Sequence, residues 1–243
     1  MGRIEEMLRE KCKERTLCFA LIDSEMQEPL KASKMAKEAE EIGVDVILVG
    51  GSSVIDQIEL NEVIKAIKDN VNIPIILFPG NVTGVSPYAD AILFSSLLNS
   101  ENPYYITQAQ ALGALAVKKY NLESISMGYL IIGDGSTAWF VGQARGIPFN
   151  KPKIAVMYAL AAQYMGMRAL YLEAGSGAKQ HVEPEMVSAV RANFNGLLIV
   201  GGGIRDAKAA KAISDAGADV IVIGTAFEEK GATVLKDIIN VIK

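Results

Sequence analysis

The sequence predicts an α/β protein of one domain, residues 1–243, folded as a (β/α)8 TIM barrel. Short apolar runs alternate along the whole chain with longer runs of helical periodicity, and eight of the short runs can be counted. Strands that are apolar throughout and separated by helices are typical of a parallel sheet buried on both faces. No Pro/Ser-rich linker divides the chain, so eight such units fit one closed barrel. A doubly wound open sheet is the alternative fold.

The predicted strands are short and apolar, and most are followed by Gly, Ser, Asp or Pro, which favour loops. They are Leu17–Ile22, Val46–Val49, Ile75–Phe78, Ala91–Phe94, Ser126–Ile132, Ala169–Leu172, Leu197–Val200 and Val220–Ile223. The helical periods lie between them. They cover Lys31–Glu41, Leu60–Asp69, Tyr105–Lys119, Lys153–Tyr164, Pro184–Ala192, Asp206–Ala216 and Thr233–Ile242.

Two connections depart from this alternation. The segment Pro79–Asp90 is short and contains two prolines and two glycines, so we expect no full helix there. The segment Gly133–Asn150 is a long loop that carries Trp139. Loops of this length in compact domains are usually functional or lie at interfaces.

The composition excludes several classes of protein. Half of the residues are hydrophobic and 21% are charged, which excludes intrinsic disorder. With 24 basic and 28 acidic residues the net charge is −4, so we expect no nucleic-acid partner. We expect no membrane span, and the charged start of the chain predicts a cytoplasmic protein. The apolar excess needs cover, which predicts a homo-oligomer or an apolar ligand groove.

Glycine-rich turns follow the last two predicted strands. Gly201–Gly203 precedes one helix and Gly224–Thr225 precedes another, as in the phosphate site of many barrels. Glycine lets the backbone approach an anion closely, and Thr225 adds a hydroxyl donor. These turns predict a phosphate-binding site, although tight turns alone would also require glycine.

Two further groups of side chains lie at predicted strand ends. Asp23 ends the first strand and Ser52 follows the second, a donor set that suits Mg²⁺ completed by waters and substrate phosphates. Asp23 could equally be a base or a helix cap. Alternation along the sixth strand places Tyr171 and Glu173 on one face, where they could hold and deprotonate a hydroxyl. A structural ion pair is the other interpretation of Glu173.

Six motifs occur in an order that resembles the geranylgeranylglyceryl phosphate synthase family of archaeal ether-lipid synthesis. They are Leu21–Ile22–Asp23, Val49–Gly50–Gly51–Ser52, Phe78–Pro79–Gly80, Tyr171–Leu172–Glu173–Ala174–Gly175–Ser176–Gly177, Gly201–Gly202–Gly203–Ile204–Arg205 and Ile223–Gly224–Thr225. The Tyr-Leu-Glu-Ala-Gly-Ser-Gly run is the most specific of them. The resemblance implies a modified barrel whose third helix is replaced by an extended segment. The chain departs from the family at Ser24–Glu25, where the family often has Pro and an acidic residue.

The resemblance also implies a prenyltransferase. It would join the 3-hydroxyl of sn-glycerol 1-phosphate to an allylic polyprenyl diphosphate, geranylgeranyl diphosphate by inference, and release diphosphate. Asp23 and Ser52 would hold Mg²⁺. Tyr171 and Glu173 would orient the 3-hydroxyl of the acceptor, and Glu173 would accept its proton. The residues implied to hold the glycerol phosphate are Tyr171, Leu172, Glu173, Ala174, Gly175, Ser176 and Gly177, with Gly202, Gly203, Gly224 and Thr225 on its phosphate.

Two rival functions fit a phosphate-binding barrel. One is an isomerase that uses Asp23 and Asp134, after the first and fifth predicted strands, as an acid–base pair. The other is a phosphate-binding protein without catalysis. The location of a prenyl channel, and therefore the donor length, does not follow from the sequence.

Overall fold

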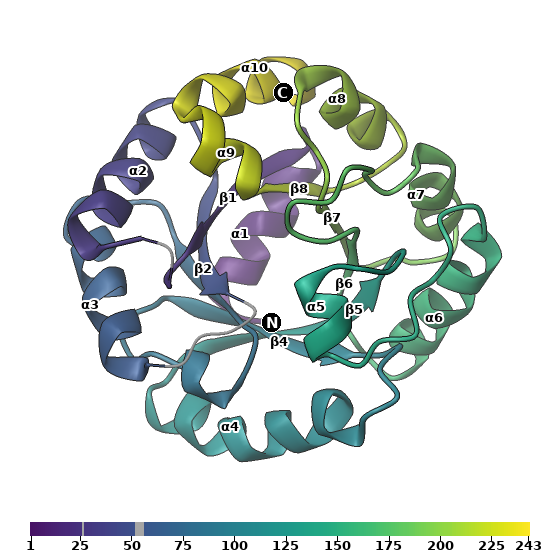
Figure 1. The fold of residues 1–243 in the computed structure, drawn as a ribbon, viewed down its shortest axis with the longest axis horizontal. Coiled ribbons are helices and arrows are strands. Elements are labelled where there is room, and N and C mark those ends of the chain that lie inside the picture. The colour runs from purple at the N-terminus through teal and green to yellow at the C-terminus, as the bar shows by residue number, and fades with distance from the viewer. Residues whose placement is uncertain (26, 52–55) are drawn as a thin grey trace.

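Eight parallel strands close into a barrel in the computed structural model, which describes residues 1–25, 27–51 and 56–243 (Figure 1). The strands pair in chain order, and β1 completes the ring by pairing with β8. They are β1 (Leu17–Asp23), β2 (Val46–Gly51), β3 (Ile75–Pro79), β4 (Ala91–Leu97), β5 (Glu123–Ile131), β6 (Ala169–Glu173), β7 (Leu197–Gly201) and β8 (Val220–Ile223). The predicted closed barrel is therefore confirmed, and the open sheet is not adopted.

Helices surround the sheet at each place where the sequence shows a helical period (Figure 1). They are α2 (Pro29–Glu41), α3 (Gln57–Lys68), α4 (Ala109–Lys119), α6 (Pro152–Tyr164), α7 (Pro184–Arg191), α8 (Ala207–Asp215) and α10 (Ala232–Ile242). Local chemistry sets several of the starts. Proline occupies the first turn of α2, α6 and α7, and the Asp56 and Asp206 side chains cap α3 and α8.

The third connection has no full helix, as its prolines and glycines predict. Between β3 and β4 the described chain forms only the 3-10 turn η1 (Val82–Gly84). Hydrogen bonds hold this segment against α3, from Gln57 Nε2 to the Val85 carbonyl at 2.5 Å and from Ser86 Oγ to Asn61 Oδ1 at 2.6 Å. This segment therefore packs directly against α3 and α4 without a helix of its own.

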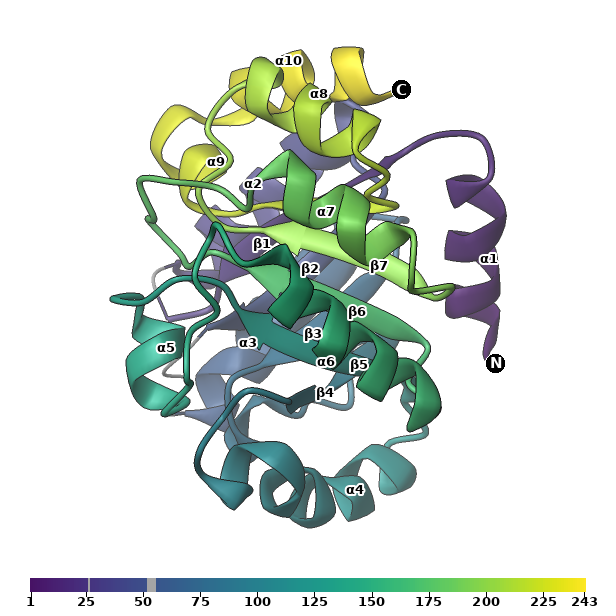
Figure 2. The same cartoon turned by 90° about the vertical axis from the view of Figure 1, so that its right-hand side faces the viewer.

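Three further helices are not predicted. They are α1 (Arg3–Cys12), α5 (Thr137–Val141) and α9 (Thr225–Lys230), and a π-helical turn, η2 (Tyr104–Gln108), leads into α4. Helix α1 lies across the end of the barrel where the strands begin (Figure 2). Its Ile4 and Leu8 are buried against the barrel interior, so this helix closes the floor of the barrel.

Apolar side chains form two layers, one inside the barrel and one between the sheet and its helices. Alternation along each strand assigns residues to these layers. On β1, for example, Phe19 points inward and Ile22 outward. The inward layer changes character toward the strand ends, where polar groups such as Asp23 and Glu173 replace the apolar ones. Among the described helices, none has the length and apolar character needed to cross a bilayer.

Candidate active site

The site lies at the mouth of the barrel, the end formed by the strand carboxyl ends and the loops that follow them. Tyr171 and Glu173 are successive inward residues of β6. Glu173 is paired in register with Ile131 on one side and Gly201 on the other. A Cβ atom at Gly201 would overlap the Tyr171 hydroxyl, so glycine is required there for the tyrosine to reach the mouth.

Glu173 is only 6% exposed, and its partners are neutral. The Gly175 amide donates to Glu173 Oε1 at 2.6 Å, and the hydroxyls of Tyr171 and Tyr129 also bond to the carboxyl group. Burial raises the pKa of Glu173 above its usual value, while the bonds from Gly175, Tyr171 and Tyr129 oppose this rise. No ion pair found among the described residues includes Glu173, so the carboxylate is available to a ligand.

Three aromatic rings pack together beneath this carboxyl group. The ring centroids of Phe78 and Tyr171 are 5.2 Å apart in a stacked pair, and Tyr129 meets both rings edge-on at 5.4 and 5.3 Å. Burial, followed by the charge of Glu173, raises the pKa of both tyrosines well above the usual value. Both phenols therefore stay protonated and act as donors. Tyr129 was missed in the sequence, although its inward position two residues before Ile131 could have indicated it.

The predicted glycine turns converge on one depression, which we call the glycine hollow. It is lined by Gly175, Ser176, Gly177, Gly202, Gly203, Arg205, Gly224 and Thr225, with Tyr171 and Glu173 at its inner side. Thr225 Oγ1 accepts the Gly177 amide at 3.1 Å and lies 3.1 Å from Ser176 Oγ, which ties two of the loops together. At Gly202 the backbone has φ +80°, and a Cβ atom would overlap Glu173 Oε1. Close approach to the carboxylate therefore requires glycine here.

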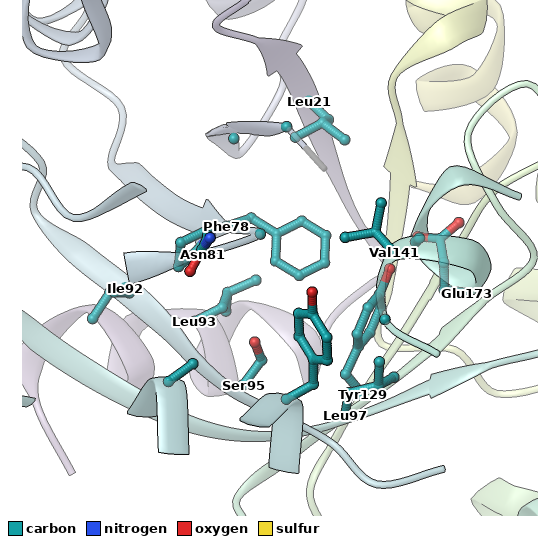
Figure 3. A pocket seen from close by; sticks show the side chains of 18 of the residues that line it. Leu21, Phe78, Asn81, Ile92, Leu93, Ser95, Leu97, Tyr129, Val141 and Glu173 are labelled. Atoms are coloured by element: carbon teal, nitrogen blue, oxygen red, sulfur yellow. The ribbon is translucent and has the colours of Figure 1, made fainter. Parts of the chain in front are cut away.

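A second, larger cavity opens from the same place and runs outward through the gap left by the missing helix. It shares Glu173, Ser176, Gly224 and Thr225 with the glycine hollow. Its outer walls form what we call the apolar channel, made by Phe78, Val82, Val85, Ile92, Phe94, Ala109, Gly113 and Val117. Figure 3 shows Phe78, Leu93, Tyr129 and Glu173 facing this space. The buried carboxyl group thus stands where a polar and an apolar cavity meet.

Acidic groups from the two ends of the chain meet on the opposite side of the mouth. Asp23 Oδ1 accepts the Glu25 amide at 3.0 Å, and a Cβ atom at Gly51 would come within 2.7 Å of the same oxygen. Glu228, on α9, accepts the Asp23 amide at 3.4 Å. Burial raises the pKa of Glu228; the Asp23 amide lowers it, and the Asp23 charge raises it further. Glu228 was not identified in the sequence, and Ser52 lies outside the described residues.

The acid–base pair of the isomerase interpretation does not assemble. Asp134 is exposed and lines neither the glycine hollow nor the larger cavity, whereas Asp23 lines the latter. Sequence spacing alone had placed both residues after strands of the barrel. Asp134 therefore does not join Asp23 in either cavity, and this pairing is not favoured.

The family model for the PcrB family matches residues 9–242. The chain belongs to the PcrB family. Its sequence is 63% identical over 236 residues to the geranylgeranylglyceryl phosphate synthase of Nitrosopumilus maritimus, covering 97% of this chain and 94% of that protein. With the synthase of Thermococcus sibiricus the identity is 52%, covering 100% of this chain and 97% of the relative. The resemblance identified from the six motifs is therefore confirmed for this PcrB-family protein.

A solved structure agrees with the family assignment. The crystal structure of (S)-3-O-geranylgeranylglyceryl phosphate synthase from Thermoplasma acidophilum in complex with sn-glycerol-1-phosphate has a TM-score of 0.96 to this chain. Sequence identity is 42%, and the match covers 100% of this chain and 99% of that one.

Proposed function

We propose that this PcrB-family protein is a prenyltransferase that forms an ether bond between the 3-hydroxyl of sn-glycerol 1-phosphate and geranylgeranyl diphosphate. The product begins an archaeal-type membrane lipid. The observation that carries this proposal is the junction of the two cavities at Glu173, because one reaction then joins a small anionic acceptor to a long apolar donor. The family relatives named for this activity support the same conclusion.

The glycine hollow suits the acceptor. Its backbone amides and the Ser176 and Thr225 hydroxyls offer neutral donors to a phosphate group. Arg205 lines the same hollow and contributes a positive charge, while also donating to the Gly177 carbonyl at 3.1 Å. With the phosphate held there, the glycerol chain points toward Tyr171 and Glu173.

Glu173 is the proposed general base. Its pKa is raised by burial, which brings its basicity closer to that needed to take a proton from an alcohol. The acceptor 3-hydroxyl donates to Glu173, and its oxygen attacks the allylic carbon of the donor. One carbon–oxygen bond forms as the bond to diphosphate breaks, and the hydroxyl proton passes to Glu173. Tyr171 and Tyr129 hold the carboxylate in position through their hydroxyls.

The apolar channel is the proposed site of the prenyl tail. Each buried methylene group contributes about 0.8 kcal/mol, so a long channel strongly favours long donors. The aromatic residues Phe78 and Phe94 and the wall of α4 also keep water away from a carbon that gains positive charge during bond breakage. A channel with these walls therefore both binds the prenyl tail and protects the reacting carbon from water.

The residues around Asp23 fit Mg²⁺. Mg²⁺ binds one or two carboxylates, waters and substrate phosphates, and here Asp23 lines the cavity with the Cβ-free Gly51 beside its oxygen. Bound there, the ion would neutralise charge that develops on the departing diphosphate. Asp23 is the ligand that we assign, with Ser52 implied by the family motif.

The proposed assembly is a homo-oligomer of single-domain chains. On α6 the side chains of Met157 and Tyr164 are 62% and 80% exposed, and Met165 directly after it is 64% exposed. Leu112 and Leu115 of α4 are 66% and 77% exposed. Apolar patches of this kind mark contact surfaces. Light scattering at micromolar concentration tests this point, and a monomer would contradict it.

The activity is tested by incubating the protein with sn-glycerol 1-phosphate, Mg²⁺ and prenyl diphosphates of increasing length, with mass spectrometry of the products. We expect an ether product with the geranylgeranyl donor and much less with the mirror-image sn-glycerol 3-phosphate. Binding of glycerol phosphate without any product would support the non-catalytic alternative. Full product formation with divalent ions chelated would contradict the assigned metal.

A further inference from the structure

The first loop of the mouth carries Asp23 and, two residues later, Glu25. The Glu25 side chain is exposed, and its amide donates to Asp23 Oδ1 at 3.0 Å. Glu228 is placed differently. It lines the same cavity as Asp23, although the two residues are 205 positions apart in the chain.

Closure of the barrel brings these two acids together. Pairing of β1 with β8 places the end of β1 beside the start of α9, and Glu228 Oε1 accepts the Asp23 amide at 3.4 Å. Two carboxylates held side by side in a partly buried site repel each other unless a cation lies nearby. The charge of Lys31 lowers the pKa of Glu228, but no ion pair among the described residues includes Glu228.

Buried oxygen atoms without partners occur at the same place. Gln27 is 8% exposed and its side chain bonds to Glu228, yet its Oε1 has no hydrogen-bond partner within the described residues. Ser24, next to Asp23, is 7% exposed, and its hydroxyl likewise has none there. An unpartnered buried oxygen is costly, and oxygen is the donor that hard divalent cations and their waters prefer.

We infer that Glu228 is the second carboxylate of the divalent-cation site, acting together with Asp23, with the buried side chains of Ser24 and Gln27 next to these two acids. This inference rests on the proposed function, because it concerns the ion that would accompany the diphosphate donor. It adds a ligand from α9, which follows the last strand, to a site that the sequence motifs had assigned only to the loops after the first two strands.

The direct test is the binding of Mn²⁺ in the presence of inorganic diphosphate. Calorimetry measures this binding, and the loss of the paramagnetic resonance signal of free Mn²⁺ measures it independently. Glu228→Gln keeps an oxygen that can accept the Asp23 amide and removes only the charge. We expect it to weaken Mn²⁺ binding by at least about tenfold, the usual loss when groups that support a metal are removed. Glu229→Gln is the matched control, because Glu229 instead pairs with Arg205 at 3.6 Å. We expect it to bind Mn²⁺ within about twofold of the unaltered protein.

The outcomes separate this inference from the function on which it rests. If Asp23→Asn loses Mn²⁺ and Glu228→Gln does not, Glu228 is not a ligand, while the proposed function stands. If Glu25→Gln loses Mn²⁺ binding and Glu228→Gln keeps it, the inference is also overturned, because the second carboxylate is then Glu25 in the first loop. If the unaltered protein binds no Mn²⁺ with diphosphate and forms ether product without divalent ions, the metal site itself is wrong. Thermal unfolding without metal verifies that each variant is folded.

Discussion

The two ends of the barrel each bury a glutamate, and they treat it in opposite ways. At the floor, Glu5 is 0% exposed and pairs with Arg9 at 3.0 Å and Arg168 at 2.8 Å. At the mouth, Glu173 is 6% exposed and receives only an amide and two phenols. A carboxylate neutralised by two arginines holds helix α1 in place, whereas one without a cation keeps its affinity for a proton. The comparison indicates that Glu5 at the floor stabilises the fold, whereas Glu173 at the mouth is suited to act as a base.

The contrast between the two glutamates predicts that the largest effect is a loss of turnover when Glu173 is substituted. Glu173→Gln keeps the shape of the side chain and removes the base, so we expect turnover to fall by roughly 10²–10⁴-fold, the usual contribution of a general base. The protein should stay folded and still bind sn-glycerol 1-phosphate in calorimetry. Near-normal turnover in this variant would remove Glu173 from the mechanism.

At the floor the same substitution should act on stability alone. Glu5→Gln leaves Arg9 and Arg168 without their shared acid, and we expect a loss of about 3 kcal/mol in the free energy of unfolding, the lower end for a broken buried pair. Both arginines keep partial access to water, which limits the loss. Denaturant unfolding measures it. Turnover per folded molecule should be unchanged, and a matching fall in turnover would contradict the division between floor and mouth.

A change in the apolar channel should alter donor choice. Gly113 of α4 lines the channel, and a Cβ atom there would meet Val85 at an ordinary 4.0 Å. Gly113→Phe should fill part of the space and exclude one five-carbon unit, a loss of up to ~4 kcal/mol of binding free energy for the longest donors. Competition between donors, read by mass spectrometry, measures the shift. Gly113→Ala is the control and should keep the donor preference.

The smallest predicted effect is a pH-dependent change in thermal stability. The pKa of Glu173 is raised in the folded protein, so its contribution to stability is present below the ordinary carboxyl pKa and is lost as the pH rises through the raised value. Glu173→Gln should therefore unfold at a higher temperature than the unaltered protein at about pH 8, with little difference at about pH 4. The gain should be ~1.4 kcal/mol for each unit by which the pKa is raised. Equal melting temperatures at both pH values would contradict this assignment.

Most of the barrel could be predicted from local patterns, and the exceptions have physical reasons. Helix α1 was not predicted because its short apolar side, Ile4 and Leu8, becomes meaningful only against the barrel interior. The site was predicted in part. Tyr171, Glu173 and the glycine turns lie together at the mouth. Tyr129 looked like an ordinary strand residue, and Glu228 lay outside every predicted element.

The sequence by itself determined the eight-fold alternation, the missing third helix and the glycine turns, because each depends on residues that are neighbours along the chain. Only the tertiary structure decided which of these features share a cavity. Barrel closure pairs β1 with β8 and so places Glu228 against the Asp23 amide. The missing helix gives way to a channel only because residues of α4 and of the segment after β3 line one cavity. Contacts between residues so distant in the chain leave no local pattern, since they arise from the packing of the whole barrel.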